Sequence, residues 1–482
     1  MNTQYLLEEK MNKLVQSITS RDQDFAQWYT DVCLKAELMD YTEAKGFIIY
    51  RPYGYSIWEN IQSYLDKEFK RTGHQNVYMP MAIPESLFQK EKDHVEGFSP
   101  EVAYLTHEGD ESEEKLIIRP TSEVLFCEHY RKIVSSYRDL PKKYNQWCSV
   151  VRWEKTTRPF LRGKEFLWQE GHTIHATEAE AREETLGMLE IYRKLGENLL
   201  AIPFTTGLKT EKEKFAGAIE TYAIEALMHD GKALQSGTSH YFGSGFAEAF
   251  NITFQDKDNQ LKHVYQTSWG VSTRLIGAVI MVHGDDEGLV LPPYVAPIQV
   301  VIIPIQSQKE VVKNASEKLY EALTSQGFRV TLDDSNRTPG WKFSEYEMKG
   351  VPLRIEIGPR DIENGVLTVS IRHSREKRQI PINQISHEIP KLLAEIHEAM
   401  YNKALKHVKD NTYVISDYQD FGPTIEKGGY IKMSVCGEEA ELKIKEDHQA
   451  TSRVILDEPL LYEVCPVTGK KATQTILFAR AY

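Results

Sequence analysis

The sequence lacks the long apolar stretches that membrane insertion requires. No run reaches 18 apolar residues, and the N-terminus is polar and acidic. A membrane-spanning helix needs about 20 consecutive apolar residues, and a secretory signal has a basic start followed by an apolar stretch. We therefore expect neither a membrane span nor a signal peptide, and predict a soluble, cytoplasmic protein.

Cysteine is also scarce. The five cysteines lie far apart in the sequence, at Cys33, Cys127, Cys148, Cys436 and Cys465. Small secreted domains held together by disulfides have many more cysteines, at close spacing. This pattern predicts reduced thiols rather than a disulfide framework.

An excess of positive charge is absent as well. The chain has 58 basic and 70 acidic residues, a net charge of −12. Proteins that coat nucleic acid without specificity neutralise phosphates with many Lys and Arg side chains, so the charge argues against that class. A local basic patch on an acidic body remains open, and it would suit an RNA recognised by its shape. The length of 482 residues predicts about three domains.

The most informative stretch is a predicted hairpin between Arg152 and His172. Two alternating runs, at 149–154 and 165–172, flank a short loop that contains Arg162. Because side chains alternate along a strand, Arg152 and Glu154 should share one face of the first strand. On the returning strand, alternation groups a second set: Phe166, Trp168, Glu170 and His172. A solvated polar face on an ordinary amphipathic hairpin is the alternative interpretation.

Three further polar sets accompany the hairpin: Arg119–Glu123 (RPTSE), Gln235–His240 (QSGTSH) and Gly270–Arg274 (GVSTR). The first precedes a predicted helix, where an N-cap is the simpler explanation. The second is predicted as a glycine- and hydroxyl-rich turn, and His240 alone would more often be a packing residue. Arg274 starts an apolar helix, either as a snorkelling surface residue or as a phosphate ligand.

Together these segments resemble a known enzyme family. RPTSE, VVRWE with FLRGKEFLWQEGH, and SWGVSTRLIGAVIMVHGDDEGLVLPP are similar to motif 2, motif 3 and the amino-acid loop of prolyl-tRNA synthetases, which are class II aminoacyl-tRNA synthetases. Motif 1 would be the helix and strand of Asp66–Pro84. The resemblance covers most of the chain.

The resemblance implies an α/β (α+β) protein of three domains. These would be a class II catalytic domain with an antiparallel sheet (1–296), a mixed α/β anticodon-binding domain (297–404) and a small α/β C-terminal domain (405–482). The alternation of apolar strands and helices after 297 supports the second of these. Its basic cluster, Arg372–Arg378, would face the anticodon, and a solvated hairpin is the alternative.

The resemblance also implies ligands and site residues. The ligands would be L-proline, ATP with Mg²⁺ and tRNA(Pro), and the enzyme would be a homodimer through Asp66–Pro84. The residues implied for proline are Thr121, Glu123, Arg152, Trp168, Glu170, His172 and His240. Those implied for ATP are Arg152, Glu154, Arg162, Phe166, Gln235, Thr238, Ser272 and Arg274. Arg152 and Arg274 would be the catalytic pair.

Two departures from the wider family are informative. No additional domain fits between His172 and Ser268, so the chain resembles the shorter archaeal and eukaryotic type without an inserted editing domain. The zinc-binding cysteines of that type are incomplete. Cys436 and Cys465 remain, but Glu441 and Thr468 fall where the other two would stand. Threonine is a poor zinc ligand, so we predict no zinc.

Several expectations concern the surroundings of the site. An amphipathic helix should begin after Thr177 with a capping box to Glu180, with Leu186, Leu189, Leu195 and Leu199 on its apolar face and solvated Glu and Arg residues opposite. A strand is expected at Asn76–Met81. The acidic run Asp285–Glu287 is expected to be solvated. By family similarity, the carboxylate of Tyr482 would point toward the active site.

The predicted activity is activation of proline with ATP, followed by transfer of the prolyl group to tRNA. Three alternatives remain open: a class II synthetase for another amino acid, a non-catalytic paralogue that binds tRNA, and an adenylate-forming enzyme that uses no RNA. The paralogue would be expected to lack Arg152 or Arg274, and both are present. The last alternative leaves the extra α/β domain unexplained.

Overall fold

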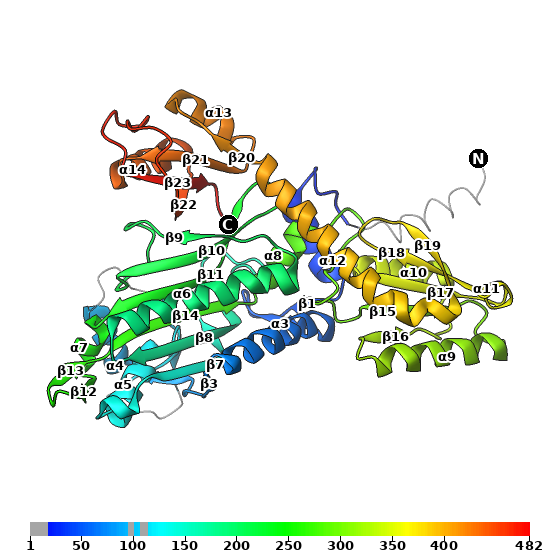
Figure 1. Ribbon diagram of the computed structural model, residues 1–482, viewed down its shortest axis with the longest axis horizontal. Helices are drawn as coiled ribbons and strands as arrows, with labels where there is room; N and C mark the ends of the chain where they lie inside the picture. The colour runs from blue at the N-terminus through cyan, green and yellow to red at the C-terminus, as the bar shows by residue number, and fades with distance from the viewer. Residues whose placement is uncertain (1–17, 95–100, 107–113) are drawn as a thin grey trace.

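The computed structural model describes residues 18–94, 101–106 and 114–482, and a large sheet runs through two of its three units (Figure 1). The sheet has eleven strands in the order β20-β21-β23-β22-β9-β10-β11-β14-β8-β7-β3. Its central strands are antiparallel: β9 (Thr205–Leu208), β10 (Glu220–Leu227), β11 (Ala233–Gly243), β14 (Tyr265–Ser272), β8 (Glu165–His175) and β7 (Lys142–Val151). The predicted antiparallel catalytic sheet is confirmed.

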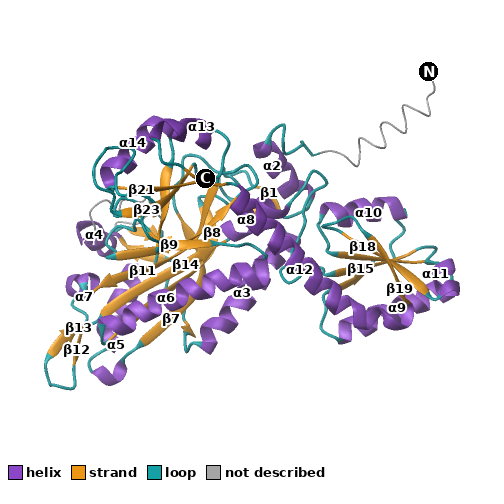
Figure 2. Ribbon diagram, turned by 45° about the horizontal axis from the view of Figure 1, so that its top comes forward, coloured by secondary structure: helices purple, strands orange, loops and turns teal. Residues whose placement is uncertain are grey.

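Helices cover one face of this sheet, and part of the opposite face is left for the site. The covering helices are α2 (Phe25–Lys35), α3 (Pro52–Arg71), α6 (Glu178–Leu195) and α8 (Arg274–His283), and α3 and α6 run alongside the strands in Figure 2. Trp28 and Trp269 are buried in the apolar core between these layers. At Gly171 the strand passes so close to Trp269 that an added Cβ would lie 2.2 Å from its ring.

Helix α6 starts as predicted but differs in its buried face. Thr177 and Glu180 form the expected capping box. Leu195 is buried, whereas Leu186 is 47% exposed. Glu184, expected in a solvated face, is instead buried between His74 and Lys143, at 2.6 Å from each. Both partners lie outside the helix, so helical periodicity alone could not place this carboxylate.

The segment before the site has less strand than expected. Helix α3 ends at Arg71, and Gly73 follows it with a φ of +85°. The expected strand at Asn76–Met81 is reduced to β3 (Gln75–Asn76), which pairs with β7 at the sheet edge. Beyond it, the Met79 amide donates to a side chain rather than to a neighbouring strand. Pro80 has no N–H to extend the ladder.

Smaller elements complete the first unit. A hairpin is formed by β1 (Met39–Tyr41) and β2 (Ile48–Tyr50), and a second one by β12 (Thr253–Gln255) and β13 (Leu261–His263). A three-stranded sheet contains β4 (Ala82–Pro84), β6 (Leu116–Ile118) and β5 (Tyr104–Leu105). The described part of this unit also contains α4 (Glu85–His94), α5 (Glu123–Ile133) and α7 (Gly245–Phe250).

The second unit is a mixed α/β fold, as predicted. Its sheet has the order β16 (Val330–Leu332), β15 (Val300–Pro304), β17 (Leu353–Ile357), β18 (Val366–Ile371) and β19 (Lys377–Pro381). The helices are α9 (Glu310–Ser325), α10 (Pro339–Met348), α11 (Pro359–Asn364) and the long α12 (Ile385–Asp410). Helix α12 connects this unit to the third one and spans position 404, where a boundary was expected (Figure 1).

The third unit extends the catalytic sheet. It contains β20 (Thr412–Val414), α13 (Phe421–Ile425), β21 (Tyr430–Val435), α14 (Glu438–His448), β22 (Thr451–Leu456) and β23 (Gln474–Ala479). Strand β22 meets β9 at Ile455 and Leu208. Within the described ranges, no helix is both long enough and apolar enough to cross a membrane.

The prediction of a solvated acidic run at Asp285–Glu287 is wrong for its first residue. Asp285 accepts two hydrogen bonds, of 2.6 and 2.8 Å, from the guanidinium of Arg372 in the second unit. Its carbonyl also accepts from the Trp28 indole N–H at 2.9 Å. Asp285 therefore connects the first two units, whereas Asp286 is exposed to solvent.

Candidate active site

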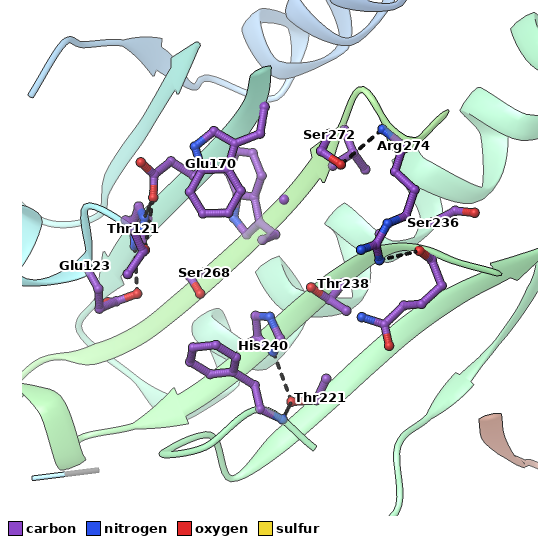
Figure 3. Close-up of a pocket in the computed structure, with 18 of the residues that line it drawn as sticks. Thr121, Glu123, Glu170, Thr221, Ser236, Thr238, His240, Ser268, Ser272 and Arg274 are labelled. Carbon is purple, nitrogen blue, oxygen red and sulfur yellow. Dashed lines mark hydrogen bonds and ion pairs between the residues drawn. The ribbon is translucent and has the colours of Figure 1, made fainter. Parts of the chain in front are cut away.

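A cavity of about 460 Å³ opens on the free face of the central strands (Figure 3). It is lined by all the predicted site residues except Glu154 and Arg162. The predicted residues that line it are Thr121, Glu123, Arg152, Phe166, Trp168, Glu170, His172, Gln235, Thr238, His240, Ser272 and Arg274. The structure thus brings these side chains together, and their individual roles stay predictions.

Strand alternation explains most of this convergence. On β8 the side chains at positions 166, 168, 170 and 172 all reach the cavity. The Gln235–His240 segment is part of strand β11, so the predicted turn is wrong. The pairing of β11 with β10 has a bulge in this segment. Gly237 pairs with Ile224, but the next pair along β10 is Glu225 with Gln235, so Ser236 is an extra residue without a partner opposite it in the strand pairing. Four consecutive residues around the bulge, 235–238, line the cavity.

Glu154 and Arg162 lie outside the lining because the hairpin changes course beyond Val151. The Glu154 amide donates to the Arg152 carbonyl at 2.8 Å, a tight turn that ends strand alternation. The expectation that Glu154 shares a face with Arg152 therefore fails. Both residues still act on the site electrostatically, since each influences the pKa of Arg274.

One half of the cavity contains a buried cluster of two carboxylates and an imidazole. His172 lies between them, with Nδ1 3.0 Å from Glu123 Oε2 and Nε2 3.0 Å from Glu170 Oε2. Glu170 also accepts from the Ser122 amide at 3.1 Å and from the Thr121 hydroxyl at 3.3 Å. The Phe126 ring stacks on the imidazole at 4.3 Å between ring centroids.

The protonation states in this cluster follow from its contacts. Burial disfavours the charge on Glu170, but hydrogen bonds and charge from His172 outweigh burial, so the pKa of Glu170 is lowered. Burial likewise disfavours imidazolium, yet the two carboxylates hold the pKa of His172 above its ordinary value. Glu123 keeps one oxygen, Oε1, buried and without a hydrogen-bond partner among the described residues. That oxygen can accept from a bound ammonium group.

Sequence reasoning missed two residues that support this cluster. Gln146 on β7 donates to Glu170 Oε1 and to Ser122 Oγ, both at 2.6 Å. The Tyr130 hydroxyl donates to the His172 carbonyl at 2.7 Å. Gln146 has the same strand parity as Arg152, so extending the alternation backward along β7 would have found it. Tyr130 carries no comparable signal, because its helix meets β8 only in three dimensions.

The wall opposite the cluster contains a histidine and an aromatic ring, and the charged residues Glu213 and Lys214 line the cavity beside Phe215. His240 Nδ1 lies 2.9 Å from the Thr221 hydroxyl, and the Phe215 ring lies 4.8 Å from the imidazole. Burial, together with the positive His172, lowers the pKa of His240 to about 3. This histidine is therefore uncharged at neutral pH and can serve as a shape-defining wall.

The other half of the cavity carries guanidinium groups. Arg152 donates from Nε to the Pro120 carbonyl at 3.0 Å and lies over the rings of Phe166 and Trp168. Arg274 donates to the carbonyls of Leu161 and Gln235, each at 3.2 Å (Figure 3). Burial, Arg152 and Arg162 lower the pKa of Arg274 to about 10, so it remains charged at neutral pH. An anion placed between these cations would relieve their repulsion.

The residues considered for zinc in the third unit do not form a four-ligand set. Cys436 Sγ lies 3.2 Å from the Thr468 hydroxyl. Glu441 Oε2 instead accepts from the hydroxyls of Thr210 and Ser452, at 2.7 and 2.6 Å. Across the described part of the chain, no three His, Cys, Asp or Glu side chains are grouped to hold a metal. The absence of zinc stays a prediction.

The chain end is fixed close to the catalytic sheet. The Tyr482 hydroxyl donates to Asp230 at 2.6 Å, and its amide donates to the Ala233 carbonyl at 3.1 Å. Its ring also lies 5.9 Å from the guanidinium carbon of Arg158. The predicted direction of its carboxylate stays a prediction.

Family models match three stretches of the chain. Residues 104–283 match the tRNA synthetase class II core domain (G, H, P, S and T), residues 299–392 the anticodon binding domain, and residues 418–482 the C-terminal domain of prolyl-tRNA synthetase. The chain is 61% identical to Proline–tRNA ligase of Phytoplasma australiense, over 98% of this chain and 100% of the relative. It is 57% identical to Proline–tRNA ligase of Clostridium novyi, over 98% and 100%, and 57% identical to Proline–tRNA ligase 2 of Bacillus cereus, over 97% and 99%.

Proposed function

The chain belongs to the proline–tRNA ligase family of class II synthetases and attaches proline to tRNA, and we propose that the two halves of the cavity divide this work between them. The carboxylate–imidazole half would bind proline, and the guanidinium half would bind ATP. The separation of charge across one cavity is the observation that supports this division. Proline brings an ammonium group and ATP brings phosphates, so each half meets the ligand group of opposite charge.

Proline recognition would centre on Glu123. A free proline has a protonated secondary amine with two N–H donors, and Glu123 Oε1 is a buried acceptor without a partner among the described residues. Thr121 would assist at the ring nitrogen. The walls formed by Trp168, His172 and His240 would then select a compact ring by fit.

ATP would be held by three kinds of contact: stacking on the adenine ring, charge neutralisation at the γ-phosphate, and further polar contacts to the nucleotide. Phe166 would stack on adenine, Arg274 would neutralise the γ-phosphate, and Gln235 would contact the nucleotide together with Thr238, Ser272, Glu154 and Arg162. The position of Arg274 at the start of α8 supports this role, because helix N-termini favour anions.

Arg152 would join the two substrates. It lines the cavity beside both Trp168 and Phe166, which are assigned to proline and adenine respectively. Its guanidinium has enough donors to hold the proline carboxylate and the α-phosphate together. The carboxylate oxygen would attack the α-phosphorus and expel pyrophosphate, so that positioning and charge stabilisation supply most of the catalysis. A ribose hydroxyl at the tRNA 3′ end would then attack the prolyl-adenylate and release AMP.

Mg²⁺ is proposed as part of the nucleotide substrate. Among the described residues, no three His, Cys, Asp or Glu side chains are grouped to hold a metal. Mg²⁺ commonly enters active sites bound to substrate phosphates, with few protein ligands. No catalytic step above depends on a fixed metal position.

The wider organisation remains a proposal. We assign 1–296 to the catalytic domain, 297–404 to the anticodon-binding domain and 405–482 to the C-terminal domain, in a cytoplasmic enzyme of the shorter type without an inserted editing domain. A homodimer through Asp66–Pro84 is supported by the edge position of β3 and by exposed Tyr78 and Met81 nearby.

Pyrophosphate–ATP exchange tests the assignment directly. Wild-type protein would be assayed with each of the twenty amino acids, in parallel with Arg152→Ala. Exchange that depends on proline and is lost in the variant is expected. Exchange with a different amino acid would refute the proposed pocket, and exchange that persists in Arg152→Ala would refute the role of this arginine.

A further inference from the structure

A buried ion triad joins the C-terminal unit to the catalytic sheet. Glu225 of β10 is fully buried, and Lys209 Nζ lies 2.8 Å from its Oε1. Arg453 of β22 completes the triad with two Nη2 contacts of 3.0 Å and an Nε contact of 3.2 Å to the same carboxylate. Lys209 and Arg453 are 2% and 8% exposed in their side chains.

Such a triad needs an explanation beyond stability. Removing charges from water is expensive, and a buried ion pair is often no more stabilising than apolar residues of the same volume. Arg453 also lies at an irregularity. On β22, Ser452 pairs with Phe478 and Val454 with Leu477, so Arg453 is an extra residue in that strand. The bulge accompanies the turn of this side chain toward the catalytic unit.

From Glu225 the contacts continue to the proposed ATP site. Glu225 pairs across the strands with Gln235, at the register shift that bulges Ser236 into the cavity. The Gln235 carbonyl accepts from Arg274 Nη1 at 3.2 Å. The Glu225 charge also reaches Arg274, since it acts to raise the pKa of that guanidinium.

We propose that Arg453 is a positioning residue, through which the C-terminal unit fixes the bulge at Gln235–Ser236 and thereby the orientation of Arg274 toward ATP. This inference rests on the proposed ATP-binding role of Arg274. Arg453 itself does not line the cavity. Its effect should therefore be confined to the nucleotide half and leave proline recognition unchanged.

The chain offers a closely matched control. Glu441 is also a buried charged residue of the C-terminal unit, and it accepts from Thr210, the neighbour of Lys209, and from Ser452, the neighbour of Arg453. It joins the same two units at the same place, but none of its hydrogen bonds above leads to Gln235. Glu441→Gln should therefore weaken the junction without disturbing Arg274.

The experiment is pyrophosphate exchange with full-length Arg453→Met, Arg453→Lys and Glu441→Gln, with the KM for ATP and the KM for proline measured separately. Arg453→Met should raise the KM for ATP about tenfold and change the KM for proline less than about twofold. Arg453→Lys, which keeps the charge but not the fork of donors, should give an intermediate KM for ATP. Glu441→Gln should lower the melting temperature with wild-type KM values.

Three results would overturn the inference: an unchanged KM for ATP in Arg453→Met, equal changes for both substrates, or the same rise in the KM for ATP in Glu441→Gln. If Arg453→Met does not fold, as judged by its circular dichroism, Arg453→Lys decides the question, because a wild-type KM for ATP in that variant contradicts the proposal. If the proposed proline-activating function itself were wrong, the result would be distinguishable, because the wild type would then show no proline-dependent pyrophosphate exchange.

Discussion

Replacing Glu123 by Gln should weaken recognition of the proline ammonium, and it also removes the carboxylate that lies 3.0 Å from His172. The substitution keeps the shape of a side chain that is 4% exposed and removes its negative charge. A hydrogen bond to a charged group contributes about 1.5–3 kcal/mol, which corresponds to a loss of about 10- to 150-fold in kcat/KM for proline. The KM for ATP should not change, because Glu123 faces only the proline half.

The assay is proline-dependent pyrophosphate exchange, combined with competitive inhibition by cyclopentanecarboxylate, which has the ring size and carboxylate of proline but a CH₂ group in place of the ring nitrogen. Its inhibition constant should be nearly equal in wild type and Glu123→Gln, since it cannot donate to the carboxylate. Glu184→Gln is the matched control, because Glu184 is likewise buried beside a histidine but lies outside the cavity. If proline and cyclopentanecarboxylate lost affinity equally, Glu123 would act through pocket shape and the reasoning would be refuted.

Three further predictions concern other parts of the molecule. Arg274→Ala should lower the rate of pyrophosphate exchange by about 10²- to 10³-fold, the usual loss when one preorganised hydrogen-bond donor is removed. The control is Arg337→Ala, on the exposed surface of the second unit, which should exchange pyrophosphate at the wild-type rate. The pKa of His172 is higher in the folded protein than in the unfolded chain, where it is about 6.5. The protonated His172 therefore contributes its full share to the free energy of unfolding below about pH 6.5, and this contribution is lost as the pH rises through the higher folded pKa. The melting temperature should fall over that pH range, and it should fall by less in His172→Gln. Asp285→Asn should lower the free energy of unfolding, measured with urea, by about 3 kcal/mol, because Arg372 loses its buried charged partner. A decrease of less than about 1 kcal/mol would show that this ion pair does not hold the two units together.

Local patterns in the sequence were sufficient where the fold is locally determined. Alternation alone placed Phe166, Trp168, Glu170 and His172 on one face, because a strand fixes side-chain direction every second residue. The capping box of Thr177 was also predicted correctly, because it involves only Glu180, three residues further along the chain. The polar face of the hairpin lines a cavity and is not simply solvated.

The errors fall where distant segments decide the outcome. Gln235–His240 is rich in glycine and hydroxyl residues, which disfavour strands, yet its neighbours β10 and β14 supply a ladder on both sides. Glu184 and Asp285 looked solvated because their partners, His74 and Arg372, are 110 and 87 residues away. Charge pairing across such distances leaves no periodic trace in the sequence.

The placement of charge in the cavity also bears on how two negatively charged substrate groups could be brought together under the proposed division of the cavity. In the proline half, the two carboxylates already flank a protonated His172, so a bound ammonium adds a second positive charge beside them. In the nucleotide half, Arg152 and Arg274 repel each other until phosphates arrive. Arg152 lies between Phe166 and Trp168, at the junction of the two halves. The proline carboxylate and the α-phosphate are both anions that would repel each other in water, and the proposed shared contact with this guanidinium would let them approach at contact distance. Its replacement by Lys, a single compact charge, should therefore impair the chemical step more than the binding of either substrate alone.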